Sequence, residues 1–237
     1  MNPNKKTARI AGILYLLVGI FGGFSEGFVD PKMYVVGNAA ATAGNVIANS
    51  GLVRMGVIAH LLDGTFFVFT AMTLYTLLHH VHKSVARAML ILVILASGTI
   101  CLNSVFQYES LRVATDSSYV SAFGIAGSNA LVLLLLDTQH YGTLIAQVFF
   151  GLWLVPLGYL TYKSGLFPKW LGVVLIIGGI CYLIDLFAAF LFPNLGQKIH
   201  VFVIIPSAIA EISMVLYLLI VGVKKPIWQK PSASNSI

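Results

Sequence analysis

Four of the eight acidic residues in this chain of 237 residues interrupt long apolar segments. They are Glu26, Asp63, Asp185 and Glu211. A charged side chain at the centre of a bilayer costs about 2.5–3.5 kcal/mol on insertion scales, so acids in such positions point to a function or a specific partner. In a medium of low dielectric constant a carboxylate has to pair with a cation, carry a proton or bind a metal. These four acids are therefore the first candidates for chemistry.

Two acids lie three residues from a histidine, a spacing that places both side chains on one face of a helix. The pairs are His60 with Asp63 and Asp137 with His140. Imidazole together with carboxylate suits a divalent transition metal, and the same groups could act as catalytic acids and bases. The candidate metal ligands and candidate catalytic residues are the same five: His60, Asp63, His140, Asp185 and Glu211. A proton-carrying network or simple polar contacts between helices would use the same residues.

The composition excludes a soluble protein. Hydrophobic residues make up 58% of the chain and charged residues only 9%, whereas soluble domains carry about 25% charged residues. A soluble enzyme, a nucleic-acid-binding domain and a disordered protein are therefore excluded, and an integral membrane protein remains. Cys101 and Cys181 both lie in apolar segments, where we expect small buried side chains and no disulfide.

The apolar segments predict an all-α, polytopic membrane helix bundle. A membrane-spanning helix needs about 20 apolar residues. Six segments meet this requirement: 10–28, 52–78, 88–107, 139–162, 170–192 and 201–223. We interpret residues 1–223 as a single transmembrane domain and residues 224–237 as a basic, then Ser/Asn-rich, cytoplasmic tail.

Segment 119–136 is also apolar, and the distribution of Lys and Arg decides how to interpret it. With six spans, the chain has ten Lys and Arg on the side of the N-terminus and four on the other side. A seventh span at 119–136 would reverse this bias, to six and eight. Because cytoplasmic loops carry the excess of basic residues, we expect six spans with both termini in the cytoplasm. Segment 119–136 is then an interfacial or re-entrant helix on the outer side, and 35–50 a second outer surface segment.

In this topology the polar residues of the spans fall between the middle of the membrane and its outer surface. We therefore expect a polar, acidic chamber that opens to the extracytoplasmic side. Besides Asp63, Asp185 and Glu211, the residues expected to line it are Glu26, Arg54, Asn103 and Gln107. Glu26 and Arg54 lie near the outer ends of adjacent spans, so the sequence predicts an ion pair between them.

Two stretches of the sequence are characteristic of a known family. The opening NPNKKTARIAGILYLL and the later YKSGLFPKWLG resemble a large, mostly bacterial family of multi-span integral membrane proteins that is catalogued as a domain of unknown function. The resemblance covers nearly the whole chain. It implies a fold of about six spans in a bacterial inner membrane, and it supplies no activity, cofactor or catalytic residue.

Three classes of function remain open from the sequence. The first is a protein that binds or moves a small solute, cation or proton in the chamber. The second is an intramembrane enzyme, with or without a divalent metal, that acts on a lipid or isoprenoid substrate. The third is an accessory protein whose polar residues only fix helix pairing. The partners expected are the lipid bilayer, a small molecule or lipid ligand and a second copy in a homodimer, without nucleic acid.

Overall fold

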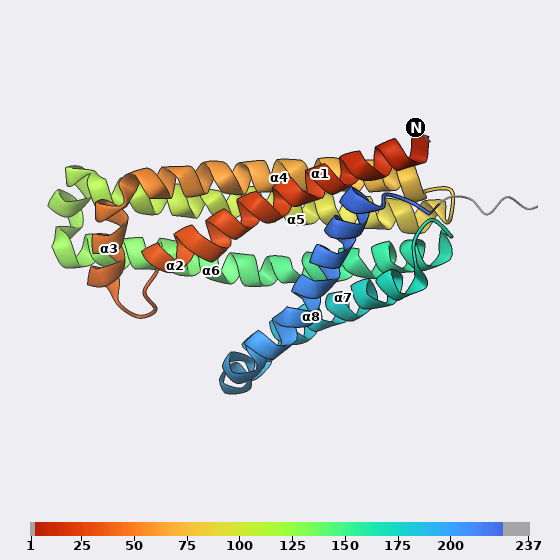
Figure 1. The fold of residues 1–237 in the computed structure, drawn as a ribbon. Helices are drawn as coiled ribbons and strands as arrows, with labels where there is room; N and C mark the ends of the chain where they lie inside the picture. The colour runs from red at the N-terminus through yellow and green to blue at the C-terminus, as the bar shows by residue number, and fades with distance from the viewer. Residues whose placement is uncertain (1–2, 225–237) are drawn as a thin grey trace, which may run out of the picture.

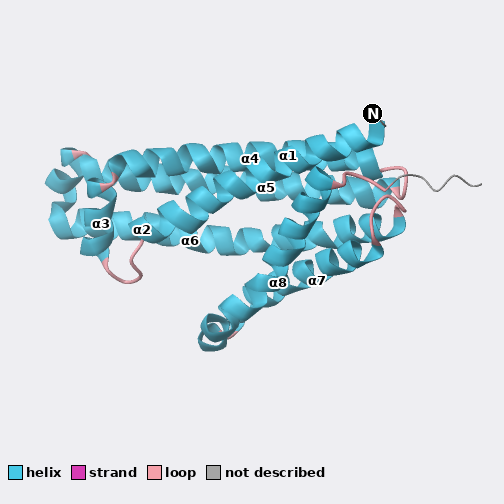
Figure 2. Cartoon of the chain, in the orientation of Figure 1, coloured by secondary structure: helices cyan, strands magenta, loops and turns pink. Residues whose placement is uncertain are grey.

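A computed structural model describes residues 3–224, and these residues form helices without any strand (Figure 2). The elements are α1 (Pro3–Phe24), the π-helical turn η1 (Ser25–Val29), α2 (Asp30–Met33), α3 (Ala39–Ala48), α4 (Ser50–Leu78), α5 (Lys83–Thr115), α6 (Ser117–Lys163), α7 (Lys169–Leu191) and α8 (Pro193–Ile220). Six helical segments are long and apolar enough to cross a membrane, so the chain is a multi-pass membrane protein. The predicted six-span helix bundle is confirmed.

The helices α1, α4, α5 and α6 run side by side along the long axis of the molecule (Figure 1). Helix α7 packs against α6, and α8 packs against α7 and α1, so the first and last helices close the bundle. Both described ends of the chain lie at one end of the bundle, which we call the terminal end. There the backbone N–H of Lys224 donates to the carbonyl oxygen of Leu166 at 2.8 Å. The opposite end holds α3 and the junction between α5 and α6.

Short polar residues set the helix boundaries. The side chain of Asn38 accepts a hydrogen bond from the backbone N–H of Ala41 at the start of α3. Asp116 separates α5 from α6 and accepts from the N–H of Ser118 at 2.9 Å, which caps α6. Pro193 occupies the first turn of α8, where the missing N–H has no cost.

The apolar side chains form two separate cores. The main core lies toward the terminal end and includes Phe67, Met89, Trp153, Leu171 and Met214. The second core lies at the other end and includes Val29, Val46, Val53, Leu111 and Val132. We call residues 29–53 and 108–136, which surround this second core, the cap. The polar residues of the spans lie mostly between the two cores.

Segment 119–136 does not form a separate interfacial or re-entrant helix as expected. From Ile125 on, its residues belong to the helix that runs through the fourth predicted span to Lys163, while the residues of α6 before Gly124 form a short helix of their own. The two helices meet at a kink at Gly124, whose φ of 70° and ψ of 169° are not helical and suit glycine because other residues would be strained there. Val132 and Leu136 pack into the second core, and α6 contacts α5 and α3. These side chains are therefore buried against other helices, whereas an interfacial helix would bury them in the membrane surface. The expected outer segment 35–50 contains the short helix α3.

Helices α6 and α7 approach closely at two pairs of facing glycines. A Cβ added at Gly158 would lie 2.6 Å from the carbonyl oxygen of Gly172. Seven residues along each helix, a Cβ at Gly151 would lie 2.7 Å from the carbonyl oxygen of Gly179. Small residues allow such backbone contact between membrane helices, which is where α6 and α7 gain van der Waals packing.

Candidate functional site

A cavity of about 670 Å³ lies between α1 and α8, and side chains of α4, α6 and α7 form its base. This volume is within the range of about 300–1,000 Å³ typical of small-molecule sites. Most of the lining is apolar. The ionisable and polar side chains that line it are Tyr15, Glu26, Asp63, Thr143, Gln147, Tyr182, His200 and Glu211. Three of the four acids that the sequence places in spans thus surround one cavity.

Glu211 on α8 is held by hydrogen bonds from two other helices. The hydroxyl of Tyr15 on α1 donates to Oε1 at 3.0 Å, and the hydroxyl of Tyr182 on α7 donates to Oε2 at 3.1 Å. Each oxygen of the carboxylate therefore has one neutral donor. These two bonds fix the position of the carboxyl group at the point where the first and last helices meet.

Asp63 on α4 is only 5% exposed, and its Oδ1 has no hydrogen-bond partner among the described residues. The backbone of α1 passes close by, since a Cβ at Gly22 would lie 3.4 Å from this oxygen. Oε1 of Gln147 on α6 is also buried without a partner. A buried acceptor that stays unsatisfied costs about 1–3 kcal/mol, so both oxygens lower the stability of this part of the bundle.

The charge of the cavity opposes the charge of the chain. The chain has a formal net charge of +6, yet none of the described residues that line the cavity is Lys or Arg. Glu26, Asp63 and Glu211 contribute three carboxyl groups, and the only basic side chain is the imidazole of His200. Among the described lining residues, acidic groups therefore outnumber basic ones by three to one.

His200 on α8 is held by Asp185 on α7. The carboxylate oxygens of Asp185 lie 2.9 and 3.0 Å from Nδ1 of His200. Asp185 is 1% exposed, whereas the side chain of His200 is half exposed and lines the cavity. A carboxylate that holds one ring nitrogen of a histidine orients the ring and fixes its tautomer, which leaves the other nitrogen for proton transfer.

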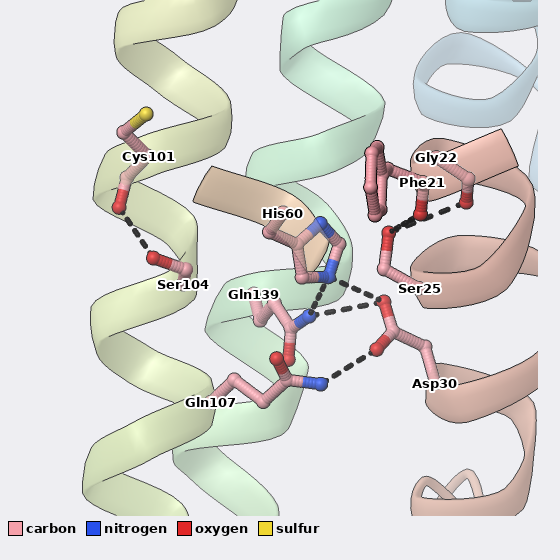
Figure 3. Close-up of polar contacts among 9 residues, drawn as sticks. All are labelled: Phe21, Gly22, Ser25, Asp30, His60, Cys101, Ser104, Gln107 and Gln139. Atoms are coloured by element: carbon pink, nitrogen blue, oxygen red, sulfur yellow. Dashed lines mark hydrogen bonds and ion pairs between the residues drawn. The ribbon is translucent and has the colours of Figure 1, made fainter. Parts of the chain in front are cut away.

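A second polar cluster lies beside the cavity and is centred on Asp30 (Figure 3). Nε2 of Gln107 on α5 donates to Oδ1 of Asp30 at 2.7 Å, and Nε2 of Gln139 on α6 donates to Oδ2 at 3.0 Å. Nε2 of His60 on α4 lies 3.4 Å from the same Oδ2. The carboxylate of Asp30 therefore joins the end of the first span to α4, α5 and α6.

A π-helical turn positions this acid. The first span continues through η1 into α2, and the hydroxyl of Ser25 donates to the carbonyl oxygens of Phe21 and Gly22 at 2.9 and 3.3 Å (Figure 3). These bonds supply donors to carbonyl groups that lie next to the π-turn. Such turns insert one residue into a helix and are frequent at functional sites. Here the turn contains Glu26, which lines the cavity, and directly precedes Asp30, which contacts His60.

The five candidate metal ligands do not come together. His60 contacts Asp30, Asp63 and Glu211 line the cavity, and Asp185 holds His200. His140 is exposed and its ring lies against Tyr34, whose hydroxyl donates to Asp137. Within residues 3–224, no group of three or more His, Cys, Asp or Glu is arranged to hold a metal ion. The donor set therefore does not fit a metal, and we assign no step to one.

The predicted ion pair between Glu26 and Arg54 is wrong. Arg54 is exposed and borders a separate apolar hollow of about 450 Å³ on the other side of α1, so it is not part of the cavity. Among the described residues, the ion pairs are His60 with Asp30, Arg112 with Glu109 and His200 with Asp185. Burial inside the bundle would cost the guanidinium its hydration, whereas the outer face of α4 leaves it exposed.

Two other residues expected in the chamber lie next to it. Gln107 belongs to the Asp30 cluster. Asn103 is buried on α5 against Gly142 of α6, and its Nδ2 has no partner among the described residues. Neither side chain lines the cavity.

Three important residues were not singled out from the sequence. Asp30 reads as a loop residue because Pro31 follows it and a span of normal length ends before it. The glutamine amides at 107 and 139, each in an apolar stretch, are a signal that could have indicated a buried acceptor. Tyr15 and Tyr182 read as ordinary apolar positions, and nothing in their spacing indicates that both reach Glu211.

Comparison with known proteins gives a family but no activity. Residues 10–222 match the family described as a domain of unknown function, DUF4386. An uncharacterized protein of Archaeoglobus fulgidus is 47% identical to this chain over 49 residues, which cover 20% of this chain and 30% of that protein. The similar region is thus less than a third of that relative. No solved structure matches the chain.

Proposed function

Because this chain belongs to the DUF4386 family, whose description assigns no activity, we propose a function from its cavity. The protein binds a small, positively charged solute inside the membrane, in contact with Glu26, Asp63 and Glu211. The observation that carries this proposal is the composition of the cavity, which combines three carboxyl groups with no Lys or Arg among its described lining residues. The polar side chains of Thr143 and Gln147, which also line the cavity, support it because each carries an acceptor oxygen.

Each carboxyl group has a distinct part in this proposal. Glu211 is fixed by Tyr15 and Tyr182 and supplies an anchored charge. Asp63 lines the cavity from α4, and its carboxyl group accepts from the solute. Glu26 ends the apolar part of the first span and faces the same volume. A bound cation supplies the positive charge that balances these three neighbouring carboxyl groups.

The test is thermal unfolding of the purified protein in the presence of small cations. Methylammonium, ethylammonium, sodium and potassium chlorides are compared at equal ionic strength. A ligand at about 100 times its Kd stabilises the folded state by about 2.7 kcal/mol, which gives a clear increase in Tm. We expect at least one cation to raise the Tm of the natural chain, and Asp63→Asn and Glu211→Gln to lose the effect.

Glu109→Gln is the matched control, because this carboxylate is exposed and pairs with Arg112 away from the cavity. It should keep the full response. If no cation stabilises the natural chain, or if the cavity variants respond as well as the control, the proposal fails.

We further propose that both termini lie in the cytoplasm and that the cap lies on the opposite side of a cell membrane. Both described ends share one end of the bundle, and ten of the fourteen Lys and Arg belong to that side in the six-span topology. A reporter that is active only outside the cytoplasm, fused after Lys225, should be silent. An active reporter would reverse the orientation. The homodimer expected from the sequence stays a prediction.

Acid–base chemistry on a lipid in the same cavity is the second candidate function. The pairing of Asp185 with His200 favours it, because a histidine held at Nδ1 by a carboxylate is suited to proton transfer. His200→Gln and Asp185→Asn should then cause the same lipid to accumulate in the host membrane, as measured by mass spectrometry. Lipid profiles identical to those of the natural chain would exclude this function.

A further inference from the structure

The opening of the cavity is apolar and lies on the side of the bundle. Leu16 and Ile20 on α1, and Ile212 and Leu216 on α8, line the cavity and are also 42–58% exposed. A side chain that is both exposed and part of the lining marks the opening. These four residues belong to membrane-spanning segments, so the opening faces lipid.

The way α1 and α8 meet creates this lateral opening. The two helices touch near the terminal end, where a Cβ at Gly12 would lie 2.9 Å from Cβ of Leu218. From there they diverge toward the α7–α8 turn (Figure 1). Along the divergent part α1 carries Gly19 and Gly23, and a Cβ at either one would meet nothing within 4 Å. The gap therefore has room for the chain of a ligand.

Apolar residues dominate the sequence around the opening, where Glu211 is the acid next to Ile212. Residues 10–25 of the first span and 201–210 of α8 contain no Asp, Glu, Lys or Arg. Glu26 and Glu211 are partly buried, and Asp63 is 5% exposed. An apolar entrance that leads to buried acceptors fits a molecule with an apolar chain and a cationic head.

Accepting oxygens also select the kind of head. The carboxyl groups of Glu26, Asp63 and Glu211 line the cavity and accept N–H donors, which a primary ammonium group has and a quaternary ammonium group lacks. We propose that the ligand is an amphiphile with a primary ammonium head on a single alkyl chain, which enters sideways between α1 and α8. This inference rests on the proposed cation-binding function and adds the substrate class and the entrance.

The experiment measures binding to the full chain in nanodiscs of zwitterionic lipid, by the shift in Tm. The probes are dodecylammonium, dodecyltrimethylammonium, dodecanoate and ethylammonium. We expect dodecylammonium to bind, the trimethyl compound to bind about tenfold more weakly because it has no N–H donor, and dodecanoate not to bind. Asp63→Asn should weaken dodecylammonium binding by about tenfold as well.

A variant at the entrance separates lateral entry from simple partition of the probe into lipid. Gly19→Leu places a side chain in the gap and should abolish dodecylammonium binding while ethylammonium still binds. Gly98→Leu is the matched control, since Gly98 is an exposed glycine of α5 with nothing within 4 Å of its Cβ position. It should bind both probes like the natural chain. If Gly19→Leu is unfolded, Gly23→Leu makes the same test.

The outcomes distinguish the two proposals. If ethylammonium binds and dodecylammonium does not, the amphiphile inference is overturned and the proposed function stands. If Gly19→Leu binds dodecylammonium as the control does, lateral entry at this gap is overturned. If the amine, the trimethyl compound and dodecanoate bind alike, the site recognises only an alkyl chain and both proposals fail. If neither amine binds, the amphiphile inference is overturned, and the proposed function falls with it only if sodium, potassium and methylammonium also fail to raise the Tm.

Discussion

The close contact between α6 and α7 gives a prediction whose size follows from the structure. A Cβ at Gly158 would lie 2.6 Å from the carbonyl oxygen of Gly172, whereas ordinary contacts of a Cβ begin at 3.4 Å. The difference, 3.4 minus 2.6, is 0.8 Å, and the helices must separate by this amount to admit a methyl group. Inserting a methyl group into a well-packed interface typically costs about 1–3 kcal/mol.

Gly158→Ala also changes the intrinsic preference for helix, which favours alanine over glycine by about 1 kcal/mol. Gly98→Ala measures this second effect alone, because nothing lies within 4 Å of a Cβ at Gly98. The quantity predicted is therefore the difference between the two variants. We expect Gly158→Ala to be about 1–3 kcal/mol less stable than Gly98→Ala, and the packing effect to exceed the helix preference.

The assay is reversible unfolding by SDS in mixed micelles, followed by circular dichroism. Adding Gly172→Ala to Gly158→Ala should cost less than the two single changes together, because the helices have already separated. Gly158→Ala and Gly98→Ala should instead combine additively within about 0.5 kcal/mol. If Gly158→Ala is as stable as Gly98→Ala, the close approach of α6 and α7 is refuted.

Three further predictions concern the cap and its boundary with the cavity. Asp30→Ala removes the acceptor of two glutamine amides and should lower the free energy of unfolding by about 1–3 kcal/mol, and an unchanged SDS midpoint would mean that the amides find other partners. Gly124→Ala should lower the free energy of unfolding by about 1–3 kcal/mol, because alanine is strained at the φ of 70° found there. Gly44→Ala in α3, where a Cβ would meet nothing within 4 Å, should not lower it. Burial, and after it the hydrogen bond and charge of Asp137, raise the pKa of Tyr34 above its usual value near 10. The unfolded chain therefore loses this proton at a lower pH than the folded protein. The contribution of Tyr34 to the free energy of unfolding is fully present below about pH 10 and is lost as the pH rises above it. Tyr34→Phe should remove that part of the alkaline loss in a pH series of Tm values, and an identical loss in the variant would contradict the contact.

The architecture could be predicted from the sequence because lipid imposes simple rules. The length of the apolar segments and the distribution of Lys and Arg indicate six helices. The high cost of acids in lipid indicates that Glu26, Asp63 and Glu211 are special, and the structure places all three around one cavity.

Other features depend on which helix faces which. Arg54 and Asp63 lie on the same helix, yet one is exposed and the other buried, and helix rotation is not visible in an apolar sequence. Asp30 lies beyond the length that a bilayer requires, so no rule about lipid predicts that the first span continues through a π-turn. The length of α6 was missed for the same reason, because its residues exceed the number that a bilayer requires.

The closure of the bundle by its first and last helices has a consequence for biosynthesis. A ribosome releases α1 first and α8 last, so the side of α1 that will face α8 waits in lipid while the intervening helices are made. During this time Tyr15 has no carboxylate to bind, because Glu211 is still untranslated. A chain arrested after α7 would lack one side of the cavity, so Glu26 and Asp63 would lie in an open groove. Addition of α8 closes this groove and supplies the carboxyl group that Tyr15 and Tyr182 contact.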